Sequence, residues 1–162
     1  GEKGEKGDAG QNGACAGYFY AEASCVPVVV LSQGRANIRL GEKINSGGLI
    51  SSYEDRITLK KGHIYSLSIS GSLEVASNEF NNSGNYSVQM TDGYDNDFCR
   101  EATRIKRDGT KIPQTKDQYA FNFTRLYDAS AKDITLEFWF EQSAYNTILR
   151  GFNGNIVVTA LN

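Results

Sequence analysis

A stretch rich in basic side chains offers the clearest chemistry in this chain of 162 residues. Residues 100–116 contain two acids, Glu101 and Asp108, with Asp117 just beyond; the basic residues are Arg100, Arg104, Lys106, Arg107, Lys111 and Lys116. Arginine binds sulfate, carboxylate and phosphate groups through paired hydrogen bonds. The stretch therefore predicts a site for an anionic glycan, which three copies around one axis would bind more tightly than one. The alternative is a solvated hairpin whose lysines discourage pairing at a sheet edge.

A polar loop at residues 91–97 carries oxygen-bearing side chains at Asp92, Asp95, Asn96 and Asp97. Carboxylate and amide oxygens are the ligands that Ca²⁺ prefers. The loop therefore indicates a candidate calcium site formed by Asp92, Asp95 and Asp97. Its spacing is not that of an EF-hand, and no glutamate closes it. A polar turn without metal is the alternative.

The residues that could perform catalysis are poorly arranged for it. Glu137 and Glu141 would lie on one face of a strand, about 13 Å apart, which is too far for the paired carboxylates of a glycosidase. The single histidine, His63, has no evident cysteine or serine partner. The three cysteines form no C-x-x-C pair, so a zinc site is not expected. We therefore expect a protein that is not an enzyme, with calcium as the one candidate cofactor.

Glycine recurs at every third position of the first segment, at Gly1, Gly4, Gly7, Gly10 and Gly13. Only glycine fits at the axis of three wound polyproline-II chains, so this period predicts a collagen triple helix and hence a homotrimer. The segment contains no proline to pre-set its backbone. We therefore expect the end of a longer stalk, held in register by the domain that follows. A flexible glycine-rich linker is the alternative.

The rest of the chain is expected to form a neck, residues 14–24, and one head, residues 25–162. A chain of this length can bury one core. The formal net charge of -2 gives no general attraction to nucleic acid. No apolar run is long enough to cross a membrane, so membrane insertion is not expected.

Alternation of apolar and polar residues predicts β-strands throughout the head. The clearest run is 63–76, where Tyr65, Leu67 and Ile69 alternate with serines. Further strands are expected at 25–31, 56–59, 86–90, 98–105, 118–125, 133–141, 145–149 and 155–161, with a turn at 151–154. No segment indicates a helix. The sequence therefore predicts an all-β sandwich, jelly roll or barrel.

Three stretches resemble the trimeric jelly-roll superfamily of complement globular heads and tumour-necrosis-factor-like domains. ITLKKGHIY, residues 57–65, leads into the long strand like the family's Pro-Gly-x-Tyr motif, with Lys61 in place of the proline. IKRDGTKI, residues 105–112, resembles its charged central hairpin, and FNGNIVVTAL, residues 152–161, resembles its last strand.

This resemblance implies an antiparallel jelly-roll sandwich that is homotrimeric, with the inner sheet of each subunit at the trimer seam. It also implies that strand residues are divided between the subunit core and the seam; these residues include Tyr65, Phe121, Phe123, Trp139 and Phe140.

A proline-free, charged collagen segment is more similar to bacterial or bacteriophage collagen than to animal collagen. With its head, the chain resembles phage tail fibres and the collagen-like spore-surface glycoproteins of the exosporium. The resemblance implies an extracellular, non-enzymatic, trimerising head on a cell, spore or virion surface that binds a cell-surface glycan or receptor, as in a tail fibre or adhesin. The alternative is a structural knob that trimerises and caps a filament without any ligand.

Overall fold

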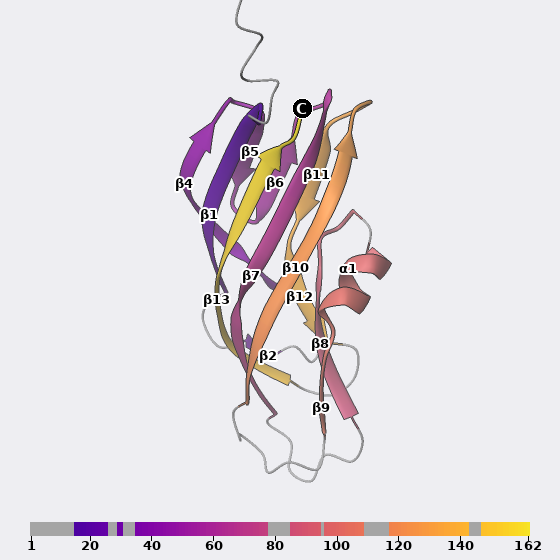
Figure 1. Ribbon diagram of the computed structural model, residues 1–162. Coiled ribbons are helices and arrows are strands. Elements are labelled where there is room, and N and C mark those ends of the chain that lie inside the picture. Colours follow the sequence, from indigo (N-terminus) through magenta and orange to yellow (C-terminus); the bar gives the residue numbers. More distant parts are fainter. Residues whose placement is uncertain are drawn as a thin grey trace, which may run out of the picture.

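A computed structural model describes residues 15–25, 29–30, 35–77, 85–94, 96–108, 117–142 and 147–162. These residues form antiparallel strands in two layers, with one short helix, α1 (Asn96–Thr103), beside them (Figure 1). The glycine-repeat segment, Gly1–Gly13, lies outside the described residues. The collagen-like stalk therefore stays a prediction.

The first layer is one long sheet with the strand order β10-β7-β13-β1-β4, and β2 pairs with β13. Its strands are β1 (Gly17–Cys25), β2 (Val29–Val30), β4 (Arg39–Ser46), β7 (His63–Ser77), β10 (Asp117–Ala129) and β13 (Thr147–Ala160). All of their pairings are antiparallel. Strand alternation sends Tyr65, Leu67 and Ile69 of β7 into the core, where they are fully buried, and leaves the serines between them on the other side.

The second layer combines the sheets β3-β12-β8-β9 and β11-β6-β5. Its strands are β3 (Arg35–Asn37), β5 (Ile50–Tyr53), β6 (Arg56–Leu59), β8 (Asn85–Thr91), β9 (Ile105–Asp108), β11 (Ile134–Glu137) and β12 (Trp139–Gln142). The two sheets meet at Phe138, whose carbonyl accepts from Ile38 N at 3.1 Å and whose N–H donates to Asp55 O at 3.1 Å. The expected single strand 133–141 is therefore divided at this residue.

The connections between the two layers define a jelly roll. The chain passes from β1 and β2 in the long sheet to β3 in the second layer, returns to the long sheet at β4, crosses to β5 and β6, and returns at β7. It continues through β8 and β9 to β10, crosses again to β12 and ends with β13 between β1 and β7. Two antiparallel sheets connected in this way form a jelly roll. The predicted antiparallel β fold is confirmed and matches a jelly roll, and the predicted homotrimer stays a prediction.

Two expected boundaries are wrong. Residues 17–24, assigned to a neck, form most of β1, which pairs with β13 and β4 on its two sides and buries Phe19, Ala21 and Ala23. The turn expected at 151–154 is instead part of β13, because that segment is paired with β1 and β7 simultaneously. Glycine signals a turn only where neighbouring strands do not already fix the backbone.

The helix α1 replaces a strand expected at residues 98–105. Within it Cys99 and Thr103 are both buried, one turn apart. The Thr103 hydroxyl donates to Cys99 O at 2.7 Å and accepts from Met90 N at 2.9 Å, which ties the helix to β8. Over so few residues, alternation of apolar and polar side chains does not distinguish a strand from a helix with one buried side. The strand predicted at residues 98–105 is therefore wrong.

Candidate functional site

The predicted basic stretch is divided between different elements. Arg100 lies on α1, Arg104 follows it, and Lys106 and Arg107 lie on β9. Lys111 and Lys116 lie outside the described residues, and the side chain of Arg107 is not described.

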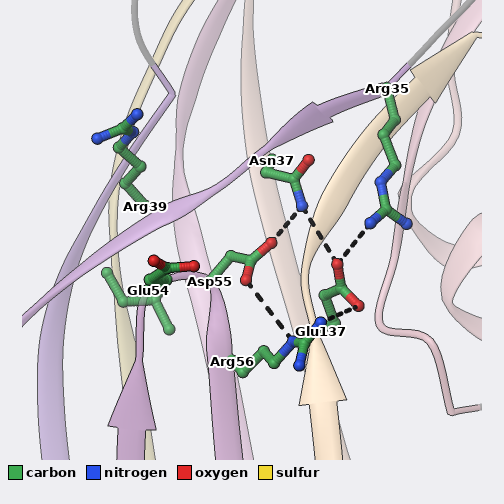
Figure 2. Close-up of a pocket in the computed structure, with 8 residues that line it drawn as sticks. Arg35, Asn37, Arg39, Glu54, Asp55, Arg56 and Glu137 are labelled. Atoms are coloured by element: carbon green, nitrogen blue, oxygen red, sulfur yellow. Dashed lines mark hydrogen bonds and ion pairs between the residues drawn. The ribbon is translucent and has the colours of Figure 1, made fainter.

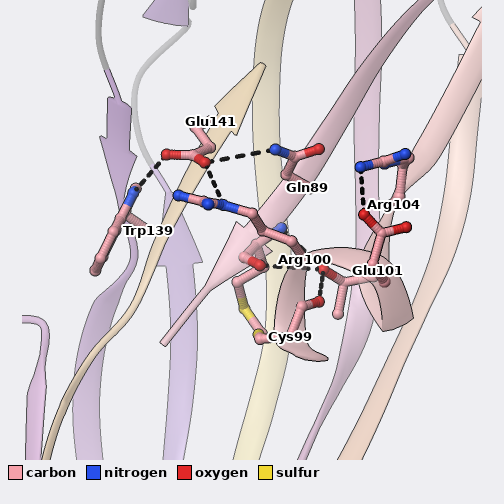
Figure 3. A network of polar contacts seen from close by, with 9 residues as sticks. Gln89, Cys99, Arg100, Glu101, Arg104, Trp139 and Glu141 are labelled. Atoms are coloured by element: carbon pink, nitrogen blue, oxygen red, sulfur yellow. Dashed lines mark hydrogen bonds and ion pairs between the residues drawn. The ribbon is translucent and has the colours of Figure 1, made fainter. Parts of the chain in front are cut away.

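Two arginines of this stretch are held by carboxylates (Figure 3). Arg100 Nε is 2.6 Å from Glu141 Oε1, and Arg104 Nη2 is 2.5 Å from Glu101 Oε1. Glu141 Oε2 also accepts a hydrogen bond from Trp139 Nε1 at 3.2 Å. Both arginines are therefore less available to an anionic glycan than their spacing suggests, and the glycan site on this stretch stays a prediction.

The acidic loop contributes one aspartate to the interior. Asp92 is fully buried; its Oδ1 accepts from Tyr94 N at 2.9 Å and its Oδ2 accepts from the Tyr127 hydroxyl. Asp95 lies outside the described residues, and the side chain of Asp97 is not described. The described part of the chain contains no group of three or more acidic, histidine or cysteine side chains able to hold a metal ion. Calcium binding by this loop stays a prediction.

Arg125 on β10 completes the surroundings of Asp92. Its Nη1 lies 3.9 Å from Asp92 Oδ2, and its guanidinium lies 4.9 Å from the ring centroid of Tyr127. The exposed rings of Phe98 and Tyr94 lie 5.2 Å and 5.7 Å from the same guanidinium. The cation thus balances a buried carboxylate and contacts three aromatic faces.

The pKa of the Tyr127 hydroxyl is raised above its usual value of 10.0, first by burial and then by the negative charge of Asp92. Above this usual value the unfolded chain loses the tyrosine proton while the folded chain keeps it, so stability must fall as pH rises. The substitution Tyr127→Phe removes this hydroxyl and with it this contribution to the pH dependence of stability. We expect the stability advantage of the parent over this variant to shrink by about 1 kcal/mol between pH 10 and 11, because the unfolded tyrosine is already half ionised at pH 10. Denaturant unfolding of both proteins at both pH values measures this change. A difference in unfolding free energy that stays the same from pH 10 to pH 11 would contradict the raised pKa of Tyr127.

The side chains considered for catalysis make structural contacts instead. Glu137 pairs with Arg35, Glu141 pairs with Arg100, and the His63 ring contacts the carbonyl oxygen of Asn162. The two glutamates therefore belong to separate ion-pair clusters. Among the described residues they do not form an acid–base pair.

A charged hollow of about 520 Å³ opens where the two sheets of the second layer meet (Figure 2). The break at Phe138 leaves room there between β3, the β5–β6 turn and the end of β11. Its lining is formed by side chains from these elements and from the start of β4: Arg35, Asn37, Arg39, Leu40, Glu54, Asp55, Arg56 and Glu137. We call this site the charged hollow.

Part of its lining is fixed by a polar network. Glu137 Oε1 accepts from Arg35 Nη2 at 2.5 Å and from Asn37 Nδ2 at 3.4 Å, and its Oε2 is 3.7 Å from Arg56 Nη2. Asn37 also donates to Asp55. Because the carboxylates of Asp55 in the β5–β6 turn and of Glu137 on β11 share one amide, Asn37, Asp55 and Glu137 hold each other in position.

The β5–β6 turn at the rim is strained. Glu54 has a φ of 56°, a left-handed value that costs a non-glycine residue about 1–2 kcal/mol. Its carbonyl accepts from Leu40 N at 3.2 Å, which holds the turn against β4. Strain of this kind often lies at functional sites.

Sequence reasoning missed the charged hollow. The one available signal was Arg35-x-Asn37-x-Arg39, in which polar side chains alternate as they do on one face of a strand. Asp55 and Glu137 come from distant segments and are brought there by strand pairing alone.

The outer side of the long sheet forms a second candidate surface, which we call the open face. Twelve outward positions on three adjacent strands carry no charged side chain: Ser66, Ser68, Ser70 and Ser72 on β7, Ala120, Asn122, Thr124 and Leu126 on β10, and Asn153, Asn155, Val157 and Thr159 on β13. Glu22 on β1, opposite Asn155, and Glu74 on β7 are the charged outward residues beside them. In Figure 1 no labelled helix or strand covers it. Four large apolar side chains are exposed on it at its upper end: Tyr18, Ile44, Leu126 and Val157.

The described residues contain no helix long and apolar enough to cross a membrane.

No protein-family model and no curated protein matches this sequence. Similar solved structures include the vertex protein P5 of PRD1, which is 12% identical and has a TM-score of 0.47, over 93% of this chain and 100% of that chain. Murine APRIL is 9% identical with a TM-score of 0.40, over 84% of this chain and 98% of its own. The globular domain of zebrafish complement 1qA is 8% identical with a TM-score of 0.43, over 89% of this chain and 97% of its own.

Proposed function

We propose that this chain is a non-enzymatic head that assembles into a homotrimer on an extracellular fibre at a cell, spore or virion surface. The open face carries the proposal. A wide sheet face with few charges, and with four large apolar side chains exposed, fits a surface that is covered in the assembly.

The matching surface is the edge of the same sheet. The edge strand is β10, and α1 lies beside it with Tyr94 and Phe98 exposed at 45% and 51%. Among the residues whose side chains the structure describes, the other exposed large apolar ones are Tyr18, Ile44, Leu126 and Val157 on the open face, and Tyr53 and Leu161 elsewhere. In our proposal the β10 edge of one copy packs on the open face of the next. Contacts between two different surfaces form a ring when the rotation closes, here after three copies.

This arrangement would serve the glycine-repeat segment. Gly17 pairs with Ala160 at the end of the sheet where Tyr18 and Leu126 are exposed. Three copies joined there would bring their N-terminal segments together, as a triple helix requires. Cys15, which is exposed and free, would lie close to its copies.

Recognition of a surface glycan or receptor, as by a tail fibre or adhesin, is the second part of the proposal, and the charged hollow favours it over a purely structural capping knob. A knob without a ligand has no need of a strained, charged hollow at its surface.

We expect Val157→Arg to convert the trimer to a monomer, because the change places a charge at the centre of the proposed contact. Val157 is 41% exposed in the single chain, so the substitution should leave the subunit folded. Tyr53→Arg is the matched control, since Tyr53 is 73% exposed and lies on β5 in the other layer. Light scattering after size exclusion gives the masses, and circular dichroism checks the fold. A monomeric parent, or a trimer of Val157→Arg, would contradict the proposed assembly.

A further inference from the structure

We propose that the charged hollow binds a saccharide that carries a carboxylate. The site goes beyond the trimeric head, because one subunit supplies all of its residues. Its test therefore does not depend on assembly. The volume of about 520 Å³ lies within the range of small-ligand sites.

Arg39 supplies the anion-binding group. Arg35 and Arg56 are both paired with Glu137. Within the described chain Arg39 has neither an ion pair nor a side-chain hydrogen bond, and Figure 2 shows it apart from the dashed network. A guanidinium offers two parallel donors that match the two oxygens of a carboxylate.

The acceptors in the hollow suit hydroxyl groups. Glu54 is exposed at the rim, without an ion pair to any described residue, and Asp55 lines the wall beside it. Carboxylates accept hydrogen bonds from sugar hydroxyls. They also repel a phosphate group, whose charge is higher than that of a carboxylate, because the lining contains Glu54, Asp55 and Glu137 in addition to its three arginines. A ligand with one carboxylate and several hydroxyls can bind both Arg39 and the acceptor carboxylates of Glu54 and Asp55.

The site is organised before any ligand binds. Asn37 and Glu137 are held by the network described above, and the Leu40 N–H fixes the strained Glu54 turn. The wall formed by Asn37, Asp55 and Glu137 therefore needs little ordering when a ligand binds, which favours the affinity of a small ligand. The strain at Glu54 places the turn carboxylate at the rim where a sugar hydroxyl would meet it.

The test is a titration of the ¹⁵N-labelled full chain with methyl glucuronide, methyl glucoside and acetate, followed through the backbone amides of residues 39–40 and 54–56. The glucuronide has the carboxylate and hydroxyls, the glucoside has hydroxyls only, and acetate has the carboxylate only. We expect the glucuronide to bind at least tenfold more tightly than either of the others, with about 1.4 kcal/mol for each factor of ten. A methyl sialoside, added in the same way, distinguishes uronic from sialic acids as the source of the carboxylate.

Variants locate the binding. Arg39→Ala should weaken glucuronide binding by about tenfold, and Arg39→Lys should weaken it less, because the charge stays and the paired donors are lost. Lys132→Ala is the control, as it removes the same charge from an exposed loop away from the hollow. Equal binding of acetate and glucuronide, equal binding of glucoside, no shift with any acidic sugar, or unchanged affinity of Arg39→Ala would each overturn the proposal.

Discussion

Replacing Asp92 with alanine should destabilise the head by about 3–5 kcal/mol, the range observed when one partner of a buried charge pair is removed. The carboxylate is fully buried and accepts from Tyr94 N at 2.9 Å and from the Tyr127 hydroxyl. Its removal leaves Arg125 without the carboxylate 3.9 Å away and the Tyr127 hydroxyl without its acceptor. The cost is large because these groups cannot regain water at that depth.

Denaturant unfolding at one fixed protein concentration measures this effect, since assembly would make stability depend on concentration. Asp128→Ala is the matched control: Asp128 is exposed and bonds only to nearby Ser130 among the described residues. We expect the control to cost less than about 1 kcal/mol. A double cycle with Tyr127→Phe should show coupling between the two residues, because they share one hydrogen bond. A loss of similar size for Asp92→Ala and Asp128→Ala would show that the buried carboxylate is not required for stability.

The predictable part of the fold is the part governed by local alternation. Residues 63–76 alternate with a period of two, and β7 spans His63–Ser77. Residues 118–125 alternate in the same way and lie within β10. One such long central strand fixes which side chains enter the core of the long sheet. The pairing of Gly71 with Gly154 across β7 and β13 has no such local signal.

The charged hollow could not be predicted, because its residues meet through pairing across long sequence separations. Glu137 lies opposite Arg56 in the β11–β6 pair, and Arg35 reaches Glu137 across a sequence separation of 102 residues. The basic stretch failed as a guide for the opposite reason. Its charges are close in sequence, yet α1 turns Arg100 toward Glu141, which the sequence places 41 residues later.

Replacing Gly154 with alanine should destabilise the head by at least about 3 kcal/mol, because no space exists for a single added carbon. Gly154 on β13 lies directly opposite Gly71 on β7. A Cβ on Gly154 would overlap the carbonyl oxygen of Ser70 and would lie 2.8 Å from Cζ of Phe152. The two glycines thus leave the room that the edge-to-face rings of Phe121, Phe140 and Phe152 occupy, with centroids 5.3–5.9 Å apart.

Gly41→Ala is the matched control on β4. There the nearest atom to an added Cβ is Glu22 O at 3.8 Å, an ordinary contact, and the residue is exposed. Alanine at that position should be neutral or slightly stabilising, since it lowers the entropy of the unfolded chain. Combining Gly154→Ala with Phe152→Leu should not restore stability, because the closest obstacle is the Ser70 backbone, which belongs to a ladder paired on both sides. Recovery of stability in that double variant would mean that the ring, and not the backbone, excludes a side chain at Gly154.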